Sequence, residues 1–200
     1  KFDINAEMDE ILYTNIPLRF MQGPLTLADD AVVLSDVTAN TLGGQVSMEG
    51  GYDTKDHDNP KFDMKFDVAN MDFQESFNSL NTFQAAAPIG KYIKGNYNTT
   101  LTMSGLLGKD MMPRLSSISS DGFMQTLNGI IEGFPALKAV GDKLGMDAFN
   151  KMEIKNTKNW FSIVDGKVEV KPFDYAFKGI DMNISGWHGL EADMDYDIKA

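Results

Sequence analysis

The sequence predicts an α+β fold, in which a mostly antiparallel, curved β-sheet carries short amphipathic helices packed on or across it. Apolar and charged residues alternate without a break over residues 62–68, which is typical of a strand with one buried and one wet face. A similar alternation of apolar and acidic residues recurs at 2–8 and 192–198. At 73–86 and 127–147 the apolar spacing changes to three and four residues, which indicates helices.

The composition excludes several classes of function. The chain of 200 residues has a net charge of −11, whereas nucleic-acid binding and electrostatic attachment to anionic membranes need clustered Lys and Arg. It has no cysteine, which removes thiol chemistry and disulfides. No apolar run approaches the roughly 18 residues that span a bilayer. Binding the apolar part of a lipid does not depend on charge and remains open.

The first part of the chain is interpreted as a series of strands. Pro17 and Pro24 interrupt the second apolar region, which favours bends or an edge position there. Gly43-Gly44 marks the reversal of a hairpin. Asp72 has the character of a helix N-cap, with Glu75 three residues later as in a capping box. The expected elements are strands at 1–8, within 10–29, at 32–39, 45–52 and 61–69, and a helix at 73–86.

The second part is expected to return to strands at 94–105 and 117–125 before the longer helical pattern. That pattern, at 127–147, contains Pro135 and several glycines, so we expect two short helices there. They could cover the sheet, act as a lid or contact a membrane. Asp165-Gly166 is a favourable hairpin turn between two of the last four strands. Those strands are expected at 152–164, 167–177, 180–186 and 190–198.

A longer repeat suggests an internal duplication. Gly43 and Gly50 are seven residues apart, as are Gly179 and Gly186, and each pair precedes an alternating strand. Common ancestry of the two halves and the reuse of turn chemistry in a β-meander both explain this spacing. Because the strand pattern runs from end to end, we expect one domain over residues 1–200. Because the chain begins and ends inside such a strand, we expect a fragment of a longer protein.

Catalytic and metal-binding patterns are weak, so we expect neither an enzyme nor a cofactor. His57 lies in a polar loop beside Asp56 and Asp58, where a solvated turn is the simpler interpretation. His188 is read as part of a short turn after Trp187. Two histidines in separate segments argue against a zinc site, and a histidine-based triad would have to use one of them. An enzyme acting on an envelope polymer would need convergent carboxylates, and no pair stands out.

The run from Leu25 to Gly108 resembles the C-terminal region of AsmA-family envelope proteins. The matching features are Asp29-Asp30-Ala31, the segment "LSDVTANTLGGQV" at 34–46, "FDVANMD" at 66–72 and "LTMSG" at 101–105. The resemblance implies a Gram-negative protein anchored in the inner membrane, with most of its mass in the periplasm. It also implies a long curved sheet with an apolar groove that carries phospholipid, and a link to outer-membrane protein assembly. The family offers no catalytic residues.

We therefore expect a non-enzymatic periplasmic domain that binds or helps move lipid along an apolar face of the sheet, supporting outer-membrane integrity. The alternative is a structural module that assists outer-membrane protein biogenesis without binding lipid, through an envelope protein partner. Methionine suits adaptable apolar surfaces, although it also fills irregular cores. The candidate groove residues share the apolar strand faces: Val46, Met48, Phe62, Met64, Phe66, Leu101, Met103, Ile180, Met182, Ile184, Met194 and Tyr196.

Overall fold

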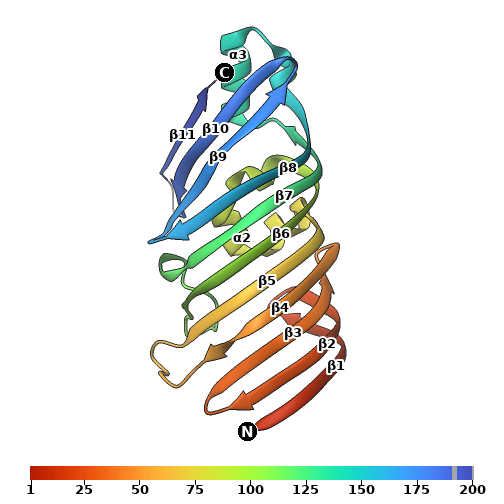
Figure 1. Cartoon of the computed structure of the whole chain (residues 1–200), viewed down its shortest axis with the longest axis vertical. Coiled ribbons are helices and arrows are strands. Elements are labelled where there is room, and N and C mark those ends of the chain that lie inside the picture. Colours follow the sequence, from red (N-terminus) through yellow and green to blue (C-terminus); the bar gives the residue numbers. More distant parts are fainter. Residues whose placement is uncertain (191–192, 200) are drawn as a thin grey trace.

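The chain forms one eleven-stranded antiparallel sheet in which every strand pairs with its neighbours in sequence. The computed structural model describes residues 1–190 and 193–199. Because the order is sequential, the two ends of the chain lie at opposite ends of the sheet (Figure 1). The strands are β1 (Phe2–Tyr13), β2 (Ile16–Ala28), β3 (Ala31–Thr41), β4 (Gly44–Asp53), β5 (Lys61–Asp72), β6 (Ile93–Leu106), β7 (Ser119–Glu132), β8 (Lys151–Val164), β9 (Lys167–Phe177), β10 (Ile180–Gly189) and β11 (Met194–Lys199).

The expectation of an α+β fold is wrong, because the molecule is mainly β. The described α-helices have only seven, six and ten residues. They are insertions between consecutive strands and do not form a layer along the sheet (Figure 1). The helical elements are α1 (Phe73–Ser79), α2 (Asn81–Ala86), η1 (Pro88–Tyr92), η2 (Leu115–Ser117), α3 (Pro135–Leu144) and η3 (Asp147–Asn150).

The helix expected at 73–86 is two helices that pack on the middle of the sheet. The Asp72 carboxylate accepts a hydrogen bond from the Glu75 amide at 2.8 Å, so the predicted N-cap is present. On β6, the ring of Tyr97 packs against Phe73 with a centroid distance of 4.6 Å. The Tyr97 hydroxyl donates to Ser76 Oγ at 2.9 Å in the buried interior. These contacts fix α1 on one face of β6.

The helical interpretation of 127–147 is wrong for residues 127–132, which belong to β7. Asn96 pairs with Asn128 while its neighbour Tyr97 pairs with Thr126, so Leu127 is an extra residue in the ladder. Such a bulge shifts the alternation by one position. Strand spacing on either side of Leu127 therefore imitates the three- and four-residue steps of a helix. The helix that follows is short and ends at Gly145, which adopts a left-handed conformation with φ 67°.

The chain segment around His188 is strand and not a turn. β10 continues through Trp187 and His188 to Gly189, so His188 is held between β9 and β11. Its partners in the ladders are Val168 and Met194. Two residues of the last expected strand at 190–198, Glu191 and Ala192, lie outside the described residues.

One row of paired residues crosses the whole sheet and defines its inner face. Its middle members are buried, with Met64 1% and Val168 2% exposed, whereas Ile4 at one end and Met194 at the other are 40% and 63% exposed. The inner face is therefore covered in the middle and open at both edges. The row is Ile4, Leu25, Leu34, Gly50, Met64, Met103, Ser120, Ile163, Val168, His188 and Met194.

Residues with positive φ inside strands bend the sheet. Phe20, Asp36 and Asn70 have φ angles of 52°, 54° and 56°, and the pairing register shifts at each of these positions. Bulges of this kind bend the strand and strengthen its twist. Asp and Asn tolerate this conformation better than other non-glycine residues, whereas Phe does not. The twisted and curved form of the sheet in Figure 1 agrees with this distribution.

Candidate apolar pocket beside the first strand

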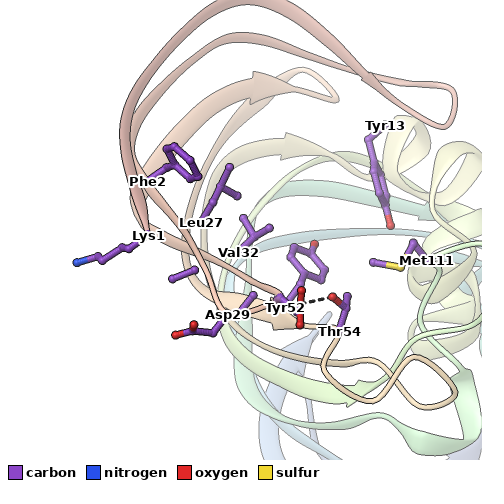
Figure 2. Close-up of a pocket in the computed structure, with 12 residues that line it drawn as sticks. Lys1, Phe2, Tyr13, Leu27, Asp29, Val32, Tyr52, Thr54 and Met111 are labelled. Atoms are coloured by element: carbon purple, nitrogen blue, oxygen red, sulfur yellow. Dashed lines mark hydrogen bonds between the residues drawn. The ribbon is translucent and has the colours of Figure 1, made fainter.

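An apolar pocket of about 710 Å³ lies on the inner face at the β1 end of the sheet. One cross-strand row forms its floor: Phe2 pairs with Leu27, Leu27 with Val32, and Val32 with Tyr52. The next member of the row is Phe62, which is buried at 5% exposure, whereas Phe2 is 71% exposed. The pocket is thus the uncovered continuation of the core (Figure 2).

The opposite wall comes from the end of β1 and from the loop between β6 and β7. Tyr13 and Met111 line the pocket from this side (Figure 2). The Tyr13 hydroxyl donates a hydrogen bond to Sδ of Met112 at 3.4 Å. Within the loop, the Gly108 amide donates to the Met112 carbonyl at 2.8 Å, which closes a tight turn. The end of β1 and the loop between β6 and β7 therefore form a wall opposite the floor, and the pocket has the shape of a trough.

The mouth of the pocket is polar. Asp29 and Asp30 form the hairpin turn between β2 and β3, and both have positive φ, which Asp adopts more readily than most residues. Thr54 donates to the Asp30 carbonyl from its amide at 2.9 Å and from its hydroxyl at 2.7 Å. Lys1 completes the rim, and its Nζ lies 3.4 Å from Oδ1 of Asp3. Charged and polar groups thus border an apolar interior.

No charged group is expected inside the pocket at neutral pH. Burial raises the pKa of the Tyr52 phenol above its ordinary value, and the nearby Tyr13 adds to the rise. Burial, followed by the negative charge of Asp110, also raises the pKa of Tyr13. Both hydroxyls therefore stay protonated under physiological conditions. An uncharged, largely hydrocarbon group is the ligand that such an interior accommodates best.

None of the twelve residues proposed from the sequence for a lipid groove lines this pocket. All of them lie on the inner face, but the fold assigns most of them to the core. Val46, Phe62, Met64 and Met182 are buried. Met194 and Tyr196 are exposed at the β11 edge, at the far end of the sheet. The partly buried members that pack against the core are Met48, Phe66, Met103, Ile180 and Ile184, and Leu101 is half-buried.

The pocket residues were missed because the alternating pattern does not tell covered strands from uncovered ones. Leu27 and Val32 flank the Asp29-Asp30 turn. Phe2 belongs to the first alternating segment, and Tyr52 shares a strand face with Val46. These signals place the residues on the inner face. The position of Tyr13 and Met111 opposite them depends on curvature and has no signal in the sequence.

The two histidines lie in separate parts of the fold. His57 is exposed in the loop after β4, where Asp56 accepts hydrogen bonds from the amides of Asp58 and Asn59 at 3.1 and 3.2 Å. His188 is buried and contacts Tyr196 and the Ala85 carbonyl. Within residues 1–190 and 193–199, no group of three potential ligands is placed to hold a metal ion. No helix in the same residues is long and apolar enough to cross a membrane.

Comparisons with known proteins leave the family of the chain open: no protein-family model, curated protein or solved structure matches it significantly. The resemblance to the AsmA family, and the periplasmic location and membrane anchor that it implies, therefore stay predictions.

Proposed function

We propose that the chain is a non-enzymatic lipid-binding domain of the cell envelope, and that it holds the acyl part of a phospholipid or similar lipid in the pocket beside β1. The observation that carries the proposal is the row Phe2–Leu27–Val32–Tyr52, which continues the buried core and becomes exposed toward the β1 edge, where Leu27 is 36% and Phe2 71% exposed. Soluble domains rarely expose contiguous apolar surface without a binding role.

Acyl-chain binding needs no catalytic or specific polar group. Each buried methylene group contributes about 0.8 kcal/mol, so a chain that lies along the floor gains affinity from contact area alone. The volume of the pocket falls within the usual range of about 300–1,000 Å³ for small-molecule sites. The polar mouth, with Asp29, Asp30 and Thr54, keeps a headgroup in water. The proposed lipid enters by its tails.

Native mass spectrometry after incubation with phospholipid vesicles tests the proposal. We expect bound phospholipid at a defined stoichiometry in the wild-type chain. The double variant Leu27→Glu/Met111→Glu introduces charges at exposed pocket positions and should abolish this binding while the fold is retained. Circular dichroism and thermal unfolding confirm that each variant is folded.

A matched control places the same charges on exposed apolar residues elsewhere. Leu144 on α3 and Val164 at the end of β8 are 47% and 54% exposed and do not line the pocket. Leu144→Glu/Val164→Glu should bind lipid as the wild type does. Absence of lipid from the wild type, or equal loss in both double variants, would contradict the proposal and favour the alternative of an assembly module.

A further inference from the structure

β8 and β9 pair with each other only beside the hairpin that joins them. The ladder between them covers residues 161–164 and 167–170 and then ends. Both strands stay paired along their length with their other neighbours, β8 with β7 and β9 with β10. Residues 151–160 and 171–177 therefore diverge as two formed strands, and the sheet has a fork between them (Figure 1).

Local backbone features turn the two strands away from each other near the end of this ladder. On β9, Lys171 and Pro172 lie opposite the single residue Ser185 of β10, which makes a bulge. On β8, Asn156 has a positive φ of 53° within the strand. Bulges bend a strand and proline interrupts its pairing, so the sequences of both strands favour the fork.

The two edges of the fork are protected against a new strand. Lys155 and Lys158 on β8 are exposed, as are Lys171 and Pro172 on β9. Lysine, proline and bulges are the features by which natural proteins keep an unpaired edge from accepting another strand. The fork is therefore better suited to opening and closing than to holding a partner strand.

Side-chain contacts close the fork on the inner face. The Tyr175 hydroxyl of β9 donates a hydrogen bond to the Glu153 carbonyl of β8 at 2.6 Å. A whole tyrosine side chain thus spans the gap, whereas strands within a ladder lie about 4.8 Å apart. The ring of Phe177 packs edge-on against Phe149 of η3, with a centroid distance of 5.3 Å. These contacts replace the missing ladder.

The strands β9, β10 and β11 form one unit beyond the fork. β10 pairs with β9 from Gly189 to Ile180, and β11 pairs with β10. His188 links this unit to α2, since its Nε2 lies 3.2 Å from the Ala85 carbonyl. A unit that is joined to the sheet by a short ladder and a few side chains opens more easily than strands that are paired throughout.

We propose that β9–β11 is a hinged flap, which turns about the hairpin at 165–166 and separates β9 from β8 at the fork. Opening exposes apolar side chains that flank the Tyr175–Glu153 contact. Ile154 follows Glu153 on β8, and Met182 pairs with Tyr175 on β10; they are 8% and 2% exposed. The inner face thereby gains a lateral entrance for an apolar group. The proposal rests on residues inside the chain and does not require lipid binding beside β1.

Single cysteines report the opening, because the chain has no cysteine of its own. Ile154→Cys and Met182→Cys place a thiol beside the fork, Val168→Cys in the short ladder and Met64→Cys in the middle of the sheet, all at buried positions. The rate of labelling by the thiol reagent DTNB is divided by the rate for the same variant unfolded in urea. We expect the two fork positions to react at least about tenfold faster than the other two.

Removing the hydroxyl that spans the fork should speed the opening. In the Tyr175→Phe background, labelling of Ile154→Cys should become about threefold to tenfold faster, because one hydrogen bond is lost. Tyr52→Phe removes a hydroxyl at the other end of the sheet and should leave the rate within about twofold. Labelling of Val168→Cys should not change in either background.

A second measurement leaves the core intact. Spin labels at Lys155→Cys/Asp174→Cys occupy exposed positions on either side of the fork, on β8 and β9. Double electron–electron resonance should show a second population at longer distance. Lys65→Cys/Asp121→Cys is the matched control, since β5 and β7 are both paired with β6 along one row, and it should give a single population.

Four outcomes would overturn the proposal. Labelling of Val168→Cys as fast as that of Ile154→Cys would show that the last strands unfold and do not swing. Fast labelling of Met182→Cys alone would show that β10 and β11 fray. Labelling of Ile154→Cys as slow as that of Met64→Cys would show that the fork stays closed. A single spin-label distance across the fork, as in the control pair, would show the same.

Discussion

The hydroxyl of Tyr13 donates a hydrogen bond to Sδ of Met112, joining the end of β1 to a loop 99 residues away in sequence. This contact and the adjacent Met111 form the wall of the apolar pocket that faces the row of Leu27 and Val32. The sheet alone would give an open surface at this end. The loop between β6 and β7 makes it a trough.

Removing that hydroxyl should loosen the wall without unfolding the sheet. For Tyr13→Phe we expect the loop to be stabilised by about 0.5–1 kcal/mol less, because one hydrogen bond is lost. Amide hydrogen exchange in residues 108–113 should therefore become several-fold faster. Tyr52→Phe is the matched control, because the Tyr52 hydroxyl has no hydrogen-bond partner among the described residues. Exchange that is equally fast in both variants would show that the Met112 contact does not hold the loop.

A charge in the middle of the long row should strongly destabilise the domain. Met64 is 1% exposed, so Met64→Asp buries a carboxylate without a partner at a cost of about 4 kcal/mol or more. We expect the Tm to fall by about 10 °C or more in a thermal melt followed by circular dichroism. Met194→Asp changes an exposed member of the same row and should stay within about 0.5 kcal/mol. A Met64→Asp variant that melts at the wild-type Tm would contradict the assignment of Met64 to the core.

Gly50 is a position where both conformation and space require glycine. Its φ is +123°, and an added Cβ would collide with the carbonyl oxygen of Asp63 on the neighbouring strand. We expect Gly50→Ala to cost about 3 kcal/mol or more in urea unfolding, because backbone must move and the conformation is strained. Gly166→Ala separates the two effects, since Gly166 has φ +72° but nothing within 4 Å of its Cβ position. The Gly166→Ala variant should lower the free energy of unfolding by about 1–2 kcal/mol.

The sequence indicates strands well where alternation is regular, and the failures have identifiable causes. Residues 62–68 alternate without interruption and lie within β5. In β7, by contrast, the extra residue Leu127 breaks the alternation, and the strand is mistaken for a helix. The turn interpretation of His188 fails because Gly186 and Gly189 suggest a reversal, whereas Gly186 leaves room for Tyr196 on the next strand.

The location of the pocket could not be predicted from the same information. Met64 and Phe2 both occupy inward positions of alternating strands, but one is 1% and the other 71% exposed. The difference depends on which strands have their inward side chains buried by the helices and loops inserted between β5 and β7. Burial by inserted helices and loops is a property of the assembled sheet. Residue type and spacing decide only the face on which a side chain lies.

Because His188 is buried, we expect the free energy of unfolding to decrease as the pH falls. It is 4% exposed, its Nε2 lies 3.2 Å from the Ala85 carbonyl and its Nδ1 lies 2.8 Å from the Tyr196 hydroxyl. Because a carbonyl can only accept, Nε2 carries the proton in the neutral ring and Nδ1 accepts from Tyr196. Burial lowers the pKa of His188, an effect that the Ala85 and Ala86 carbonyls partly offset.

A lowered pKa in the folded state means that the unfolded chain takes up this proton first. The stability contributed by neutral His188 is therefore present above the unfolded pKa of about 6.5 and is lost as the pH falls toward the lower folded value. Urea unfolding at pH 8 and pH 5 should show a smaller decrease for His188→Gln than for the wild type. His57→Gln, a change at an exposed histidine, should keep the wild-type pH dependence. If His188→Gln also keeps it, protonation of the buried imidazole does not limit stability, and the loss at low pH comes from carboxylates that all three proteins share.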